Sequence, residues 1–142
     1  MASKDKIKIE VTVEENIEKV WEYWTKPEHI TKWNFASEDW LCPSAENDVQ
    51  EGGKFVWRME AEDGSVGFDF SGTYEKVEEK KQLDYKLDDD RVVKVSFSDE
   101  DKKTTITQVF EPEEMNSREK QKEGWLAILN NFKKYAENKS KS

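Results

Sequence analysis

The chain has 142 residues, which is the size of a single domain, and its formal net charge is −9. So acidic a surface repels nucleic-acid phosphates and anionic membranes, which argues against nucleic acid as a partner and against stable membrane association. Hydrophobic content is only 35%, but six Trp, seven Phe and four Tyr indicate a packed core rather than a disordered chain. With one cysteine and no apolar run long enough to cross a bilayer, the sequence predicts one cytoplasmic domain over residues 1–142.

The chain begins with a predicted strand and two short helices. Apolar and polar residues alternate over residues 7–13, as in a half-buried strand. Asn16 can cap the first helix, and Pro27 fits the first turn of the second, where its missing N–H costs nothing. The second helix turns Ile30 and Trp33 inward. The inward face of the first helix carries Ile17, Val20, Trp21 and Trp24.

Residues 34–47 show no clean period and hold Phe35, Trp40, Cys42 and Pro43 among polar residues. Large aromatic side chains in an irregular segment must pack on something, so we expect a lid-like loop here rather than a free one. Cys42 lacks the neighbouring base or further ligands that a nucleophile or a metal site needs, so we expect a small packed residue.

From Gly52 the period switches to two, which predicts a series of strands joined by short turns. Asp63-Gly64 is a strong hairpin signal between the first two of them. In the last strand the inward face stays open, because Ile106 and Phe110 indicate one face and Val109 the other. The alternating runs are centred on residues 54–61, 66–74, 83–87, 93–97 and 104–111.

A long amphipathic helix is predicted from Asn116 to Asn138. Asn116 can cap its first turn, and Glu119 can reach back to it as in a capping box. Its apolar stripe holds Trp125, Ile128, Leu129, Phe132, Tyr135 and Ala136. The overall order is one strand, two short helices, about six further strands and the long helix, in which an antiparallel meander needs this helix as its cover. We therefore predict an α+β fold.

This order resembles the helix-grip fold of the START and birch-pollen-allergen (SRPBCC) superfamily, a curved antiparallel sheet with the order β-α-α-β-β-β-β-β-β-α wrapped around a long C-terminal helix. Within it, the sequence is similar to the family named for the activator of heat-shock protein 90 ATPase homologue, over about residues 7–137. The segments that carry this similarity are Val20-Trp21 with residues 27–33, Gly52-Gly53-Lys54-Phe55, Gly72-Thr73-Tyr74 and Gly124-Trp125.

The resemblance implies a cavity between the sheet and the long helix. The superfamily contains lipid and hormone binders, aromatic-polyketide cyclases and the chaperone activators, which share this cavity but little chemistry. The eukaryotic activators carry a further N-terminal domain that this sequence does not show, which weighs against an activator role. Many stand-alone members have no assigned activity.

The aromatic residues can be interpreted in two ways that the sequence leaves open. They form a fully packed core, or they line a cavity for a small apolar or aromatic ligand that is oriented by a few polar groups. In the second case the ligand-binding residues are predicted to be Trp33, Trp40, Trp57, Met59, Phe68, Phe70, Tyr85, Phe97, Gly124, Trp125, Ile128 and Phe132.

Other candidate residues favour structural roles. Gly124 lies inside a helix, and close packing is its more common explanation, with room at the cavity mouth as the alternative. His29 is the sole histidine, and we expect it to be exposed and without a catalytic partner. Glu38 and Asp39 could form a carboxylate pair, but no buried pair emerges from the strand pattern. We predict no catalytic residues, no metal ligands and no cofactor.

The first functional hypothesis is a non-catalytic domain that binds a small hydrophobic ligand, including lipids as a class. The alternative is a protein-interaction domain with a chaperone as its partner, as the resemblance to the heat-shock protein 90 ATPase activators implies. A cyclase- or hydrolase-type enzyme is a second alternative, which requires polar residues inside the cavity.

Overall fold

A computed structural model describes residues 6–35, 39–88, 90–112 and 117–141, and over these ranges the chain forms an α+β fold with one antiparallel sheet. The strands lie side by side in the order β1-β7-β6-β5-β4-β3-β2, so every strand from β2 to β7 pairs with its neighbour in sequence. The elements are β1 (Ile7–Val13), α1 (Ile17–Thr25), α2 (Pro27–Trp33), β2 (Trp40–Asn47), β3 (Lys54–Ala61), β4 (Gly67–Glu78), β5 (Gln82–Leu87), β6 (Val92–Asp99), β7 (Thr104–Phe110) and α3 (Arg118–Lys141).

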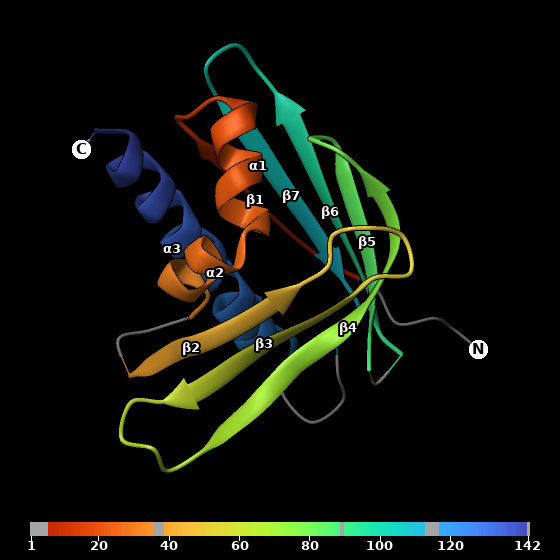
Figure 1. Ribbon diagram of the computed structural model, residues 1–142, viewed down its shortest axis with the longest axis vertical. Coiled ribbons are helices and arrows are strands. Elements are labelled where there is room, and N and C mark those ends of the chain that lie inside the picture. The colour runs from red at the N-terminus through yellow and green to blue at the C-terminus, as the bar shows by residue number, and fades with distance from the viewer. Residues whose placement is uncertain (1–5, 36–38, 89, 113–116, 142) are drawn as a thin grey trace.

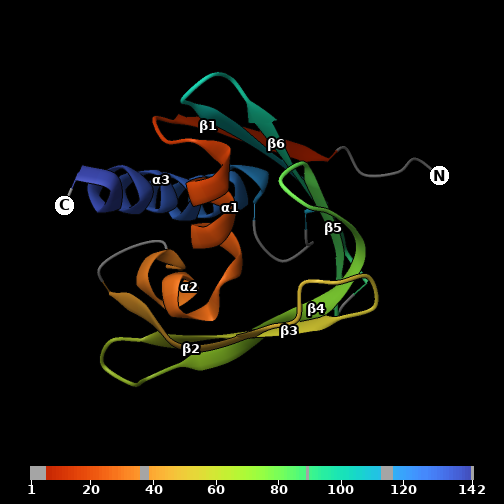
Figure 2. The ribbon, with the colours of Figure 1, turned by 45° about the horizontal axis from the view of Figure 1, so that its top comes forward.

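The sheet curls around the helices, as the predicted helix-grip fold requires (Figure 1). When the molecule is turned, β1 and β6 lie on one side of α3 and β2, β3 and β4 on the other (Figure 2). The helix packs along β1 and against α1 and α2. Among the helices of the described ranges, none combines the length and the apolar character needed to cross a membrane.

Strand β4 lies very close to β5 at Gly72. A Cβ atom on Gly72 would lie inside contact distance of the Lys86 carbonyl oxygen, so the close approach of the neighbouring strand β5 requires glycine. The pairing of β4 with β5 also shifts between Tyr74 and Lys76. Bulges of this kind increase local twist, which allows one sheet to enclose an interior.

The predictions for the start of the chain are confirmed. Strand β1 alternates as expected, with Ile7, Ile9 and Val13 buried. The backbone N–H of Lys19 donates to the Asn16 side chain at 3.0 Å, so Asn16 is the N-cap of α1. Pro27 occupies the first turn of α2.

The prediction of a lid-like loop over residues 34–47 is wrong for its second half, because Trp40–Asn47 is strand β2 at the edge of the sheet. Its pairing with β3 shifts between Leu41 and Ser44, on either side of Pro43. This irregularity breaks the period of two, and an edge strand tolerates proline because one side needs no ladder hydrogen bond. Cys42 is buried, as predicted.

The inward face of β7 is now assigned. Thr104, Ile106, Gln108 and Phe110 are buried, whereas Val109 belongs to the half-buried outer face. A glutamine therefore sits within an otherwise apolar inward row, and this is why the sequence pattern left the face open.

Helix α3 begins at Arg118 and continues to Lys141, three residues beyond the predicted end. The predicted cap, Asn116, lies outside the described residues. The backbone N–H of Lys120 donates to the Ser117 hydroxyl at 3.1 Å, so Ser117 caps the first turn. Near the other end, the Lys133 ammonium donates to the Thr12 carbonyl at 2.8 Å and pairs with Glu137 at 2.6 Å, which ties α3 to β1.

Candidate functional site

A cavity of about 300 Å³ lies between the three helices and the curled sheet. The space is partly open to solvent, with the half-exposed Phe68 in its lining, and its volume lies at the lower end of the range of small-molecule pockets. The lining comes from α1, α2, β3, β4, β5, β7 and α3, with Asn34 just after α2 and Arg91 just before β6. Its lining consists of Trp24, Trp33, Asn34, Trp57, Met59, Phe68, Phe70, Tyr85, Arg91, Gln108, Gln121, Trp125 and Ile128.

The wall on the α3 side is held by an aromatic stack. Trp125 lies flat on Phe110 of β7, with ring centroids 3.9 Å apart and planes 9° apart. Its indole also meets Phe70 edge-on at 6.0 Å, and Phe70 packs on Trp57 at 5.7 Å. These contacts link α3 to β3 and β4, and they fix the orientation of rings that border the cavity.

The wall on the α1–α2 side is fixed by hydrogen bonds as well as ring contacts. The Trp33 indole N–H donates to the Tyr23 carbonyl at 2.8 Å, and the Asn131 side chain of α3 donates to the Trp33 carbonyl at 2.8 Å. Trp24 packs on Trp33 with centroids 4.8 Å apart. A side chain satisfied in this way loses little further freedom if a ligand contacts it.

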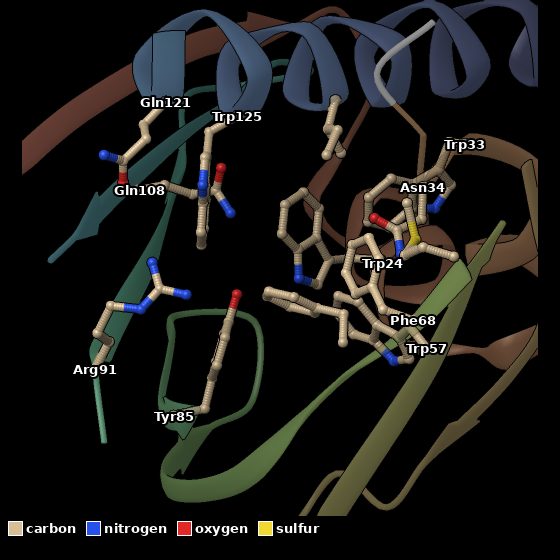
Figure 3. Close-up of a pocket in the computed structure, with 13 residues that line it drawn as sticks. Trp24, Trp33, Asn34, Trp57, Phe68, Tyr85, Arg91, Gln108, Gln121 and Trp125 are labelled. Atoms are coloured by element: carbon tan, nitrogen blue, oxygen red, sulfur yellow. The ribbon is translucent and has the colours of Figure 1, made fainter. Parts of the chain in front are cut away.

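Four polar side chains gather on one side of the cavity, opposite the rings of Trp33, Trp57 and Phe68 (Figure 3). The sheet register explains the gathering. Tyr85, Val93 and Phe110 form one cross-strand row. Arg91 stands two residues before Val93 and Gln108 two residues before Phe110, so both share the inward face of that row. Gln121 reaches the same side from α3, one turn before Trp125.

Tyr85 is the most deeply placed of these polar groups. The residue is only 2% exposed, and its hydroxyl points into the cavity (Figure 3). Burial raises the pKa of this hydroxyl above its ordinary value, so it stays protonated and able to donate. Within the part of the chain that the structure describes, the hydroxyl donates to no other residue. Gln108, 6% exposed, likewise holds its side-chain amide at the cavity without a described partner.

A second unsatisfied donor belongs to the cavity lining. The Trp57 indole Nε1 is buried and has no hydrogen-bond partner among the described residues. Most buried polar atoms in native proteins are paired, so this donor is an exception in the wall, and the nitrogen itself is not exposed to the cavity space.

The structure brings together eight of the residues predicted to contact a ligand and separates the others. Phe68 lines the cavity but is 49% exposed, and it lies at the start of β4, next to the β3–β4 turn. Trp40 packs on Phe68 at 6.0 Å without bordering the cavity, and Phe97 packs behind Trp24 at 5.8 Å. Phe132 is fully buried between Trp24 and Trp33. The eight predicted residues in the lining are Trp33, Trp57, Met59, Phe68, Phe70, Tyr85, Trp125 and Ile128.

Five lining residues were missed by the sequence reasoning, four of them polar. The signals were present for two, because Gln108 alternates with Ile106 and Phe110, and Gln121 stands four residues before Trp125. Arg91 was assigned no role, although it continues the alternation of β6 backwards. The remaining two, Trp24 and Asn34, come from the helix pair.

The prediction that His29 is exposed and unpartnered is wrong. Its side chain is only 12% exposed. One ring nitrogen, Nδ1, shares a hydrogen bond with the Tyr135 hydroxyl at 2.6 Å, and the other, Nε2, lies 3.4 Å from a Glu22 carboxylate oxygen. These three groups join α1, α2 and α3. None of them borders the cavity, so their chain of contacts links helices rather than facing the site.

Gly124 does not pack closely, and that preferred explanation is wrong. A Cβ atom built at this position would have no neighbouring atom within 4 Å. Gly124 is half-buried and does not border the cavity, so it does not form the cavity mouth either. Nothing in the structure explains why the helix carries glycine here.

The remaining candidates stay outside the site. Burial raises the pKa of the Cys42 thiol, which disfavours the reactive thiolate. Asp39 is exposed, and its proposed partner Glu38 lies outside the described residues. A search of the described residues found no group of three His, Cys, Asp or Glu side chains placed to hold a metal ion.

A sheet curled around a long C-terminal helix, with a cavity between them, defines a helix-grip protein of the START and birch-pollen-allergen superfamily. More narrowly, the chain belongs to the family described as activator of Hsp90 ATPase homolog 1-like proteins, because that family's model matches residues 14–137.

Solved structures of relatives agree with this assignment. The AHSA1-like protein from Aeromonas hydrophila is 40% identical, with 94% of each chain covered and a TM-score of 0.86. Chr148 from Cytophaga hutchinsonii is 48% identical, with 96% of this chain and 94% of that chain covered and a TM-score of 0.82. NE0264 from Nitrosomonas europaea is 17% identical over the whole of both chains, with a TM-score of 0.82, which is a likeness of fold alone. No curated protein matches the chain.

Proposed function

We propose that this protein is a non-catalytic binding domain that holds a small apolar or aromatic molecule between its sheet and its C-terminal helix. The observation that carries the proposal is the cavity of about 300 Å³ lined mainly by aromatic rings. Small-molecule sites in proteins are typically concave and mostly apolar, with a few polar groups that orient the ligand, and this cavity has that composition.

Two further features support a binding role. The rings of the wall are held in place by contacts with one another and by the Trp33 and Asn131 hydrogen bonds, so the space does not depend on mobile side chains. The Tyr85 hydroxyl, which is directed into the cavity and has no described partner, is a group that a bound molecule can satisfy.

The experiment is an NMR titration of backbone amides and Trp indoles with a panel of fatty acids, sterols and flat polyphenols. The six tryptophans provide an internal control, because Trp24, Trp33, Trp57 and Trp125 line the cavity whereas Trp21 and Trp40 do not. We expect saturable shifts at the four lining indoles and little change at Trp21. If no compound of the panel shifts the four lining indoles at millimolar concentration, the proposal fails.

A pair of variants makes the titration sharper. Ile128→Trp places a larger side chain at the cavity and is expected to abolish the shifts, since it fills the space that the ligand needs. Lys134→Trp adds the same indole to an exposed position of α3 and is expected to leave them unchanged. Equal binding by both variants would place the ligand outside the cavity.

The second candidate function is a protein-interaction domain that binds a chaperone of the heat-shock protein 90 class. It is favoured by the match to a family described by its likeness to Hsp90 ATPase activators, and by the exposed Val66 and Phe68 near the β3–β4 turn. Co-sedimentation of the purified protein with the host's homologue of this chaperone tests it. We expect Val66→Asp to weaken any complex, and the absence of a complex at high concentration would contradict this function.

A further inference from the structure

The polar side of the cavity indicates which ligand the cavity prefers. The apolar wall accepts many apolar molecules, whereas the polar groups favour those with a matching polar end. Tyr85 and Gln108 are each more than nine-tenths buried, and Figure 3 shows both side chains directed into the cavity from the sheet. Neither polar end is among the fully buried side-chain atoms that lack a partner, so both reach the cavity space, and a molecule that fills the cavity without accepting from them leaves them unsatisfied. In a wall made mainly of aromatic rings, these two groups, with Arg91 and Gln121 on the same side, mark the place where the polar end of a ligand would lie.

The charge of the lining indicates the sign of that polar end. Among the described residues that border the cavity, Arg91 is the one ionised side chain, and no Asp or Glu is present. A cavity whose ionised group is positive contrasts with the formal net charge of the chain, which is −9. The Arg91 guanidinium faces the same space as the Tyr85 hydroxyl (Figure 3).

Arg91 also has an interaction partner within the protein. A guanidinium has five N–H donors in a planar fork, so it can hold a protein group and a ligand oxygen together. Arg91 is set by the sheet, because the backbone N–H of Leu87 donates to the Arg91 carbonyl at 2.8 Å immediately before β6. The backbone position of Arg91 is therefore fixed by the turn that joins β5 to β6.

We propose that the cavity takes a small monocarboxylate with a flat apolar body, whose carboxylate lies among Arg91, Tyr85 and Gln108 and whose body lies on the rings of Trp33, Trp57 and Trp125. This inference rests on the proposed binding function and names the class of its ligand. A carboxylate accepts from all three donors, and the protonated Tyr85 hydroxyl is well suited to it. A cationic ligand would meet Arg91 with like charge, and a wholly apolar one would leave both buried donors unsatisfied.

Three naphthalene derivatives of nearly equal size test the sign of the charge. The probes are 2-naphthoate, 2-naphthalenemethanol and the cation of 2-naphthylmethylamine, each titrated into the wild-type protein and followed by the indole and amide shifts. We expect 2-naphthoate to bind at least about tenfold more tightly than the alcohol, because charge-assisted hydrogen bonds are the stronger ones. The amine is expected to bind most weakly.

Two variants with one charge removed from the same strand region provide the matched comparison. Arg91→Gln is expected to bring the affinities for 2-naphthoate and the alcohol together. Lys94→Gln removes the same charge from the exposed outer face of β6 and is expected to preserve the difference. Tyr85→Phe, which loses a hydroxyl without a described partner and should fold normally, is expected to weaken 2-naphthoate more than the alcohol. The wild-type comparison and Tyr85→Phe decide the matter even if Arg91→Gln does not fold.

The possible failures are distinguishable. If the alcohol binds as tightly as 2-naphthoate and the lining indoles shift with both, the carboxylate inference is overturned while the binding function stands. If Lys94→Gln and Arg91→Gln lower the affinity for 2-naphthoate equally, the effect is a general one of net charge, and the inference is again overturned. If none of the three probes shifts the lining indoles but a compound of the ligand panel does, the carboxylate inference is overturned and the binding function stands. If neither the probes nor the panel shifts them, both fail.

Discussion

At Tyr85, a protonated hydroxyl is held inside an aromatic interior. Phe55 packs on its ring edge-on at 5.0 Å and Tyr74 at 5.9 Å, while the hydroxyl faces the cavity. Tyr74 differs, because its hydroxyl donates to Asn47 at 2.5 Å. Burial raises the pKa of both hydroxyls, and this shared shift has a consequence for stability at high pH.

Both tyrosines have an ordinary pKa of 10.0 when the chain is unfolded, and a higher one in the folded protein. Above the lower value the unfolded state loses protons that the folded state keeps, so the free energy of unfolding falls as pH rises. Below pH 10 both tyrosines are protonated in the folded and the unfolded state, so the free energy of unfolding keeps its full value. Urea unfolding measured from about pH 9 to about pH 11.5 should show this fall, and Tyr85→Phe should make it shallower. An unchanged slope in the variant would mean that Tyr85 titrates normally.

Gly124 allows the opposite kind of change, a stabilising one. A glycine inside a helix costs up to about 1 kcal/mol relative to alanine, and no atom lies within 4 Å of the added Cβ. Gly124→Ala should therefore raise the free energy of unfolding in urea by roughly that amount. Gly72→Ala is the matched control, since its Cβ would collide with the Lys86 carbonyl and destabilise the protein. Destabilisation by Gly124→Ala would show that the open space is required.

Among the elements, the three helices are joined by side chains as well as by packing. The Tyr135 hydroxyl bonds to His29 across α3 and α2, and His29 approaches Glu22 of α1. Tyr23 packs on both His29, at 4.9 Å, and Tyr135, at 5.7 Å. This junction holds the helix pair against α3 and thus helps to define one side of the cavity.

Removing the Tyr135 hydroxyl should weaken this junction. Tyr135→Phe is expected to lower the free energy of unfolding by about 1 kcal/mol, the usual net value of one partly buried hydrogen bond. Tyr85→Phe removes the same atom from a position without a described partner, so its stability near neutral pH should stay close to that of the wild type. Urea unfolding of both variants side by side checks the prediction. Equal stabilities would show that the His29–Tyr135 bond contributes nothing.

Most elements could be predicted because their periods are regular. Strand β1, the two short helices and the long helix follow from alternation, from helical spacing, from the cap residue Asn16 and from Pro27 in the first turn of α2. Strand β2 could not be predicted, because the irregular pairing around Pro43 destroys its period and its identity depends on β3 beside it. The position of His29 depends on Tyr135, which is distant in sequence, and local spacing carries no information about that contact.

At the scale of the whole molecule, the fold follows from the order of the elements, and the cavity does not. An aromatic stripe indicates an interior, but whether side chains fill that interior depends on how the sheet curls around the helices, which the spacing along one strand does not give. For this reason the sequence pattern predicted Phe97 and Phe132 as ligand contacts, although they pack behind the wall. It did not predict Arg91 and Gln108, which line the cavity. Polar residues on an inward face are the ones that a search for apolar periodicity overlooks.

The central claim is that a small molecule occupies the interior rather than the exposed apolar residues of the β3–β4 turn. Intermolecular nuclear Overhauser effects in the complex with the tightest compound of the ligand panel test this most directly. We predict contacts from the compound to the side chains of Trp33, Trp57 and Trp125, and none to Trp21. Contacts confined to Val66 and the outer edge of Phe68 would contradict the claim and would favour an interaction surface at that turn instead.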